Sequence, residues 1–452
     1  MQALLLKAVA FVFVLGILIF VHEFGHYAVA KFFKVRVETF SLGFGKRLIG
    51  FRRGDTDYRI SILPLGGYVK MAGENPMEER TGDPGEFMSH PRWQRFLIAI
   101  AGPAMNVILA VAVLTGVYMV HHQYPAYLDQ PAQLGWVAVD SPAQKAGFQT
   151  GDKIVAAQGK DKPTWDDIRY KILGRINQNL EMDVQRGDQS LHLGLPVSIP
   201  EKGDVDILSN LGLTPEAPSI VGRVDRDTPA EKAGMQVGDE VLAVNGIKVQ
   251  SSSAVGLAEV LQKNKDNPAR ITISRKGQPL ELTITPRLLP GPPTGKEAYR
   301  IGVGMTMNFR TEKLPFAAAF NAATVDCKKN STLIFTLLGQ LFTVKGTLKQ
   351  FGGPVMIFTE SGKALEAGFI VLLEFMSLIS LNLAIFNLLP IPILDGGLVL
   401  MLLVESVMRR DIKQEVKERV YQVAFVFLVL FAAVVIYNDV VKTLPTKTHA
   451  VQ

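Results

Sequence analysis

The chain has 452 residues, of which 48% are hydrophobic and 20% charged, and its mean hydropathy is +0.20. Soluble domains carry about 25% charged residues, so this composition is shifted toward apolar character. The single cysteine, Cys327, excludes an internal disulfide and a cysteine-based zinc cluster. The net charge of +6 is small for this length and gives no reason to expect a nucleic acid as partner.

The apolar excess is concentrated in four segments that are long enough to cross a lipid bilayer, which takes about 20 helical residues. We expect transmembrane helices over residues 1–30, 96–120, 369–395 and 421–441. The first segment resembles a signal peptide in its early lysine and apolar core, but no small-residue cleavage site follows, so we interpret it as retained. The fold class expected is therefore a polytopic α-helical membrane protein.

Lysine and arginine are concentrated in two of the connecting loops. Residues 31–95 hold twelve and residues 405–420 hold five, which is 17 in 81 residues, against 28 in the 249 residues of 121–369. The positive-inside rule then places the loops 31–95 and 396–420 in the cytoplasm. Both termini, including the tail 442–452, and the large region between the second and third spans are expected on the opposite side.

This large region contains an internal repeat. The segment 141–159 recurs 87 residues later as 228–246, with ten of nineteen positions identical. Two copies at so long a period indicate tandem domains rather than a solenoid. We place these domains at residues 126–210 and 211–290.

The repeated pattern S/T-P-A-x-x-A-G-x-x-x-G-D resembles that of PDZ domains. The resemblance implies capture of an extended peptide or a carboxyl terminus beside a sheet edge. A tripeptide that precedes the second copy resembles a carboxylate-binding loop. It consists of Leu211, Gly212 and Leu213. The alternative is that the two copies are spacers that bind no ligand.

Residues 291–368 follow the repeats and contain an apolar segment, 328–349, that is flanked by lysines. Its apolar centre is too short to span a membrane. A helix lying in the membrane interface is expected, with a buried soluble helix as the alternative.

The segment His22-Glu23-Phe24-Gly25-His26 in the first span carries the chemistry. On a helix, His22 and His26 lie on one face and can bind one Zn²⁺ while Glu23 polarises a bound water. Composition predicts this motif about 0.01 times by chance. A pair of satisfied core histidines is the alternative, but ionisable residues at membrane depth are costly without a metal or a polar cavity.

A zinc site of this kind takes a third protein ligand, and Asp395 is the best candidate. The first and third spans both run toward the cytoplasm, so Asp395 and the histidines lie at a similar depth. Pro390 and Pro392 would break the helix beside Asp395, and such breaks occur around polar cavities in membranes. The alternative is that Asp395 only caps a helix over 396–408.

Together these motifs resemble the site-2 protease family of intramembrane zinc metalloproteases, over essentially the whole chain. The resemblance implies a zinc metalloendopeptidase with one Zn²⁺ per chain. The implied roles are metal ligation by His22, His26 and Asp395, general base catalysis by Glu23, and substrate positioning or oxyanion stabilisation by Asn387, with Asn382 as a second polar candidate.

Between the first two spans, the sequence predicts four short strands joined by glycines, at 35–44, 48–52, 58–63 and 67–71. The family has a membrane-associated β-region in this place. Such a region could pair with an extended substrate backbone through Gly66, Gly67 and Tyr68. An ordinary cytoplasmic hairpin is the alternative.

The resemblance implies hydrolysis of peptide bonds within the transmembrane segments of single-span membrane proteins. The implied substrates are anti-sigma factors already trimmed by a site-1 protease in an envelope stress response, and remnant signal peptides. A monomer in the bacterial inner membrane is expected, with the repeats in the periplasm and the active site near the cytoplasmic side.

Two functions of other classes stay open. A membrane scaffold with a purely structural zinc would not need Glu23 beside the ligands. A transporter with a histidine proton relay would show paired inverted repeats, and the spans lack them.

Overall fold

The computed structural model describes residues 2–74, 82–198, 207–290, 297–340 and 353–443. The chain forms two compact units. One unit consists of residues 1–121, 313–339 and 346–452, and the other consists of residues 122–312 with 340–345.

Within the described residues, four helices are long and apolar enough to cross a membrane. They are α1 (Gln2–Phe32), α2 (Arg92–Val120), α10 (Phe369–Asn387) and α12 (Gln414–Thr443). Helices occupy all four segments that were expected to span the membrane, with one correction to a boundary, since α10 ends at Asn387 and does not continue to 395.

Proline explains this earlier end. Pro390 and Pro392 cannot continue the hydrogen-bond ladder of a helix, so the chain turns after Asn387. A new helix, α11 (Asp395–Met408), begins at Asp395 itself. The segment 396–420, expected as a loop, is therefore mostly helical, formed by α11 and the first residues of α12.

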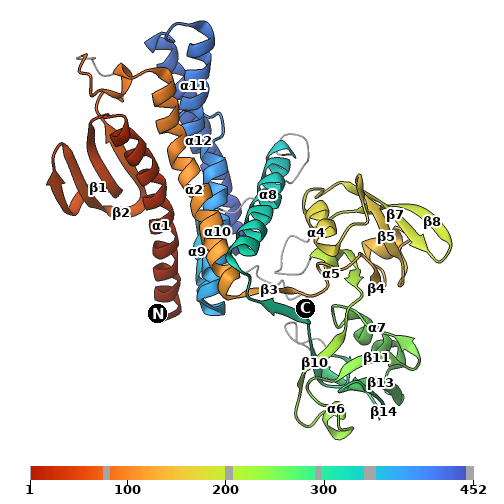
Figure 1. Ribbon diagram of the computed structural model, residues 1–452. Coiled ribbons are helices and arrows are strands. Elements are labelled where there is room, and N and C mark those ends of the chain that lie inside the picture. Colours follow the sequence, from red (N-terminus) through yellow and green to blue (C-terminus); the bar gives the residue numbers. More distant parts are fainter. Residues whose placement is uncertain (1, 75–81, 199–206, 291–296, 341–352, 444–452) are drawn as a thin grey trace, which may run out of the picture. The chain divides into compact units, whose positions relative to one another are not determined.

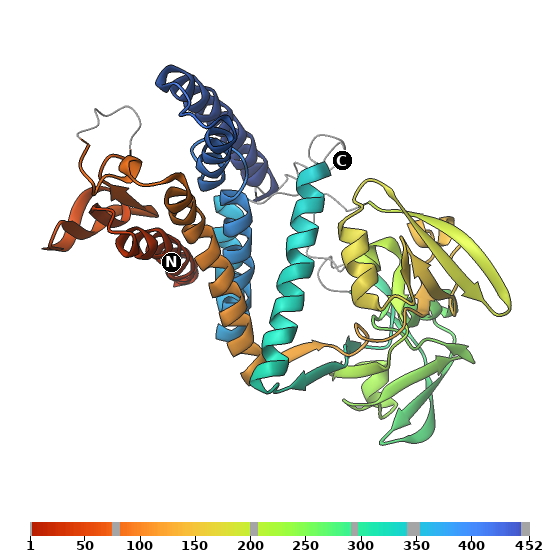
Figure 2. The same ribbon diagram turned by 45° about the horizontal axis from the view of Figure 1, so that its top comes forward.

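The membrane helices pack around α2. Helix α2 contacts α1, α10 and α11, and α9 (Pro354–Ala367), which the sequence did not suggest, contacts α1 and α10 (Figures 1 and 2). Small residues make close approach possible, for example Ala10 of α1 and Ala364 of α9 in one buried cluster. Helix α12 exposes Val423, Phe425 and Leu430, as expected of a surface that lies in lipid.

Helix α8 (Phe316–Gln340) contributes Ala319, Ala323 and Cys327 to a buried cluster with residues of α2 and α10. It begins twelve residues before the segment 328–349 in which the sequence predicted a helix. Residues 341–349 of that prediction lie outside the described residues.

The loop between α1 and α2 folds into an antiparallel pair, β1 (Val37–Arg53) and β2 (Thr56–Met71), followed by the short helix η1 (Phe87–Ser89). Both strands bend, because Phe40 of β1 pairs with Tyr58 on one side and with Val69 on the other. The four predicted short strands are thus segments of two long ones. The segment 67–71 lies at one edge of this arrangement.

The second unit contains two similarly built halves. The first half consists of β4 (Leu134–Val137), α3 (Pro142–Lys145), β5 (Lys153–Ala157), β6 (Lys160–Asp161), α4 (Trp165–Leu173), β7 (Asn179–Arg186), β8 (Gln189–Pro196), α5 (Ile207–Leu211) and β9 (Leu213–Pro215). Its sheets have the strand orders β6-β5-β7-β8 and β4-β9.

The second half consists of β10 (Ser219–Val224), α6 (Pro229–Lys232), β11 (Glu240–Val244), β12 (Ile247–Lys248), α7 (Val255–Asn264), β13 (Ala269–Arg275), β14 (Gln278–Ile284), β15 (Arg287–Pro290), β16 (Glu297–Arg300) and β17 (Val303–Thr306). Its main sheet has the order β14-β13-β11-β10-β17, and β15 pairs with β16. A further pair, β3 (His122–Pro125) with β18 (Phe309–Glu312), joins the two ends of this unit.

The aspartate of each Gly-Asp motif is a structural residue. Asp152 accepts hydrogen bonds from Nε and Nη2 of Arg186, both at 2.7 Å. In the second half, Arg275 makes the same paired contact with Asp239, at 2.7 and 2.8 Å. Burial raises the pKa of Asp239, but the hydrogen bonds from Arg275 and from the N–H of Gln236 outweigh burial and lower it below its ordinary value.

The structure corrects the assignment of Leu211, Gly212 and Leu213. Leu213 pairs with Val137 of β4, and the carbonyl of Gly212 accepts from the N–H of Ala138, so these residues belong to the first half. Their counterpart in the second half is the segment 301–303: the carbonyl of Gly302 accepts from the N–H of Asp225, and Val303 pairs with Val224. The sequence missed this because the pairing joins segments about 75 residues apart.

The domain boundaries move accordingly. The first half extends past 210 to include β9, and the second extends past 290 to include β17. Each half is thus completed by a strand at its C-terminal end that pairs with its first strand.

Candidate active site

Two histidines and one aspartate converge where α1 meets the start of α11. His22 and His26 lie one turn apart on α1, with their Nε2 atoms 3.2 Å from each other. Oδ2 of Asp395 lies 3.2 Å from Nε2 of His22, and Oδ1 lies 3.5 Å from Nε2 of His26. The three potential ligand atoms all lie within 4.8 Å of one another.

This geometry fits a zinc ion. Ligand atoms about 2.0–2.1 Å from a tetrahedral metal lie about 3.3 Å from one another, close to the separations among His22, His26 and Asp395. Both histidines are buried, and two imidazoles with one carboxylate form a donor set that suits zinc. The reading of Asp395 as only a helix cap is wrong, because Leu394 is the capping residue of α11 and the carboxylate faces the histidines.

Glu23 lies beside these residues and contacts the β-region. Its carboxylate lies near the backbone N–H of Val69 in β2. Gly67, two residues earlier, leaves the room that this contact needs, because a Cβ there would lie 3.1 Å from Cγ of Glu23 and 2.7 Å from a methyl group of Ile19. Because Gly67 and Val69 both lie next to Glu23, segment 67–71 adjoins the site.

The other residues that the sequence proposed for substrate contact lie around this edge. Tyr68 stacks on Phe44 of β1, with ring centroids 6.0 Å apart. Gly66 has a φ of +119° and also lies against Phe44, whose ring fills the space where a side chain would be. Gly66 and Tyr68 thus shape the strand, whereas Gly67 approaches the proposed base.

The two asparagines of α10 differ. Asn387, the last residue of α10, places Nδ2 3.3 Å from Nε2 of His22 and therefore lies at the site. Oδ1 of Asn382 is buried without a hydrogen-bond partner among the described residues. No contact described for Asn382 joins it to the histidines or to Asp395.

Helix α2 contributes residues to the site that sequence reasoning missed. Nδ1 of His26 lies 2.7 Å from the carbonyl oxygen of Ile98, and Nδ1 of His22 lies 3.2 Å from Nδ2 of Asn106. Between them, Gly102 lies so close to the His26 ring that a Cβ would overlap it. An available signal was that Asn106 is the one carboxamide side chain in the uncharged span 96–120.

The same helix sets the position of α10. The hydroxyl of Ser380 donates to the carbonyl of Asn106 at 2.8 Å, and the hydroxyl of Ser377 donates to the carbonyl of Ala110 at 2.9 Å. These buried hydrogen bonds hold α10 against α2, and through the turn after Asn387 they define where Asp395 begins α11.

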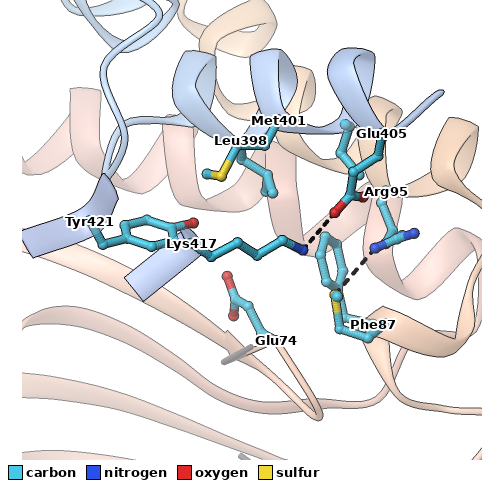
Figure 3. A pocket seen from close by; sticks show the side chains of 10 residues that line it. Glu74, Phe87, Arg95, Leu398, Met401, Glu405, Lys417 and Tyr421 are labelled. Carbon is cyan, nitrogen blue, oxygen red and sulfur yellow. Dashed lines mark hydrogen bonds and ion pairs between the residues drawn. The ribbon is translucent and has the colours of Figure 1, made fainter. Parts of the chain in front are cut away.

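A cavity lined by both charged and apolar side chains lies next to α11, at the N-terminal ends of α2 and α12. Figure 3 shows Glu405 of α11 and Lys417 of α12 meeting across it, with Nζ 2.6 Å from Oε1. Glu405 also accepts from the N–H of Ile412 at 3.2 Å and lies 3.9 Å from Nε of Arg92. Because Asp395 begins α11, this buried ion pair anchors the helix that carries the third candidate ligand.

Comparison with known proteins agrees with this geometry. The model of peptidase family M50 matches residues 10–431. The chain is 32% identical to the regulator of sigma-E protease RseP of Escherichia coli strain K12 over 464 residues, covering 97% of this chain and 99% of that protein. It is 31% identical to protease RseP of Yersinia pestis, with the same coverage. It is also 32% identical to a Vibrio cholerae protein whose name places it among the zinc metalloproteases, again with 97% and 99% covered.

Proposed function

Because the chain belongs to peptidase family M50 and is a zinc metalloprotease, we propose that it hydrolyses peptide bonds inside the membrane-spanning segments of other proteins. The observation that carries this proposal is the convergence of His22, His26 and Asp395 beside Glu23, within helices that cross the membrane. We assign the three as zinc ligands and Glu23 as the general base.

The chemistry divides between the metal and the chain. When bound, zinc lowers the pKa of a water molecule toward 7 and polarises the carbonyl of the scissile bond. Glu23 accepts the proton of the attacking water and delivers it to the leaving amide nitrogen, a role that contributes about 10²–10⁴-fold in rate. The nearby backbone N–H of Val69 can stabilise the Glu23 carboxylate. Asn387 supplies an N–H donor near the site that can stabilise the oxyanion.

A peptide bond in a membrane helix is protected by its own hydrogen bonds, so the substrate must be extended before cleavage. Segment 67–71 lies at an edge of the β-region and adjoins Glu23. We propose that the unwound substrate adds as a strand along this edge, which would present its backbone to the base and the metal.

The chain is a multi-pass protein of the bacterial inner membrane, and we propose that the site lies near the cytoplasmic face. Arg92 in the first basic segment pairs with Asp411 in the second at 2.8 Å, which supports placing the basic segments on one side of the bundle. Both termini and the second unit would then be periplasmic.

We propose that the two halves of the second unit are PDZ domains that dock the substrate or select it by size. In the first half, all three residues of β9 are buried, so this strand is less accessible to an added peptide. In the second half, β17 is a half-buried edge strand that follows Gly302. The second half is therefore the better candidate for peptide capture.

We propose that the substrates are single-span proteins of the anti-sigma factor type, already shortened by a site-1 protease, and remnant signal peptides. The similarity to regulators of sigma-E protease supports this substrate class. A monomer suffices, since all the proposed site residues come from one chain.

The decisive experiment uses the full chain reconstituted in liposomes with a single-span substrate, and mass spectrometry to detect cleavage. Glu23→Gln should lower the cleavage rate at least about 10²-fold while the protein keeps one zinc per chain. Full cleavage by this variant would refute the assignment of Glu23. Unchanged zinc content in Asp395→Asn, together with full activity, would refute the third ligand.

A further inference from the structure

The contacts of helix α2 carry an inference about how the two histidines are prepared for the metal. A neutral imidazole has one N–H and one lone pair, so a partner that accepts a hydrogen bond at Nδ1 leaves the lone pair on Nε2. His26 has such a partner, because the carbonyl oxygen of Ile98, 2.7 Å from Nδ1, can only accept. The Nε2 lone pair of His26 is therefore directed toward Asp395 and His22.

His22 needs the same arrangement, and only Asn106 is described within hydrogen-bond distance of its Nδ1. With Nδ2 of the amide facing the ring at 3.2 Å, Nδ1 would have to accept, and the proton would occupy Nε2, the atom that faces Asp395. That orientation also leaves the buried Oδ1 of Asn106 without a partner among the described residues. Rotating the amide by 180° gives Oδ1 a donor and frees Nε2 of His22.

We propose that Asn106 is a positioning residue: its carboxamide oxygen accepts the Nδ1 proton of His22 and holds the ring in the tautomer that binds zinc. The carbonyl of Ile98 does the same for His26. Ile98, Gly102 and Asn106 follow one another at intervals of four residues, so they form one stripe of α2 facing the motif on α1. Helix α2 thus orients both histidines, one through its backbone and the other through a side chain.

Asn106 is itself held in place. It is fully buried, and its backbone carbonyl accepts from the hydroxyl of Ser380 in α10. The side chain therefore has little freedom to leave His22. Partners of this kind on metal-bound histidines commonly change metal affinity by about 10–100-fold when they are removed.

The inference rests on the proposed zinc ligands, and zinc affinity tests it without any substrate. The full chain, purified in detergent and stripped of metal, is titrated with zinc alone in competition with a chromophoric chelator. Asn106→Leu should weaken zinc binding about 10–100-fold, whereas Asn106→Asp, which keeps an acceptor oxygen, should stay within a few-fold of the wild type. Thr115→Val, on the same helix, is the matched control and should bind like the wild type, because the hydrogen bond described for Thr115 goes to the carbonyl of Val111 within α2.

The order of the zinc affinities of the two Asn106 variants distinguishes a positioning role from a packing role. If Asn106 only filled space, leucine would be tolerated better than a buried carboxylate, and the order would be reversed. Equal affinities in all variants, equal losses in both Asn106 variants, or the reversed order would each overturn the inference. His22→Ala in the same titration tests the proposed site itself: if it binds zinc as tightly as the wild type, the ligand assignment fails, whatever Asn106 does.

Discussion

The buried ion pair between Glu405 and Lys417 offers a prediction about the anchor of α11. The side chain of Glu405 is 1% exposed and that of Lys417 is 10% exposed, so neither charge is well hydrated. Removing the lysine leaves the carboxylate with the N–H of Ile412 at 3.2 Å and with Arg92 at 3.9 Å. Breaking a buried pair in this way costs about 3–5 kcal/mol.

We therefore expect Lys417→Met to lower the free energy of unfolding by about 3 kcal/mol, the low end of that range, because Arg92 compensates in part. The neutral double variant Glu405→Gln/Lys417→Met should lie within about 1 kcal/mol of the wild type, since no charge is left buried without a partner. Thermal unfolding of the full chain in detergent measures both. Lys413→Met, at an exposed lysine one turn earlier, is the control.

The effects of the two substitutions on the free energy of unfolding should therefore be strongly non-additive. A double variant less stable than Lys417→Met alone would refute it, because the loss would then come from packing. A loss below about 1 kcal/mol in Lys417→Met would show that the pair is hydrated like a surface ion pair.

Three further predictions concern the candidate active site and the second unit. Gly102→Ala should abolish stoichiometric zinc binding, measured by elemental analysis, because a methyl group there overlaps the ring of His26. Val69→Pro removes a backbone N–H that lies near the carboxylate of the proposed base, so cleavage should fall while zinc content is kept; equal loss of both would contradict this. Asp239→Asn should lower the unfolding temperature at pH 7, because the lowered pKa of Asp239 means that its ion pair with Arg275 stabilises the fold above about pH 4. That difference should shrink as the pH falls through the lowered pKa, and a constant difference down to pH 3 would contradict the assignment.

The features that follow from local spacing were predictable. His22 and His26 share a helix face because they are four residues apart, and the four spans follow from length and apolar content. The break after Asn387 follows from two prolines. Asp395 was found by comparing depths, since two spans that run in the same direction bring their later halves to one level.

The features that depend on pairing between distant segments were not predictable in the same way. Leu211 to Leu213 were assigned to the wrong half, because their partner strand lies about 75 residues earlier and nothing local identifies it. The role proposed for Asn106 depends on the rotation of α2 about its own axis relative to α1, which hydropathy does not encode in a span that is apolar on all sides.

The sequence alone therefore determined the chemistry of this protein: the donor types for a metal, a base beside them and helices that place both in a membrane. These follow from residue identity and from the fixed rise and period of a helix. It is the tertiary structure that shows which groups lie against the histidines and the proposed base, namely Ile98 and Asn106 of α2 and Val69 of β2. The physical reason is that the orientation of a hydrogen bond depends on the three-dimensional approach of separate elements, which spacing along the chain does not specify.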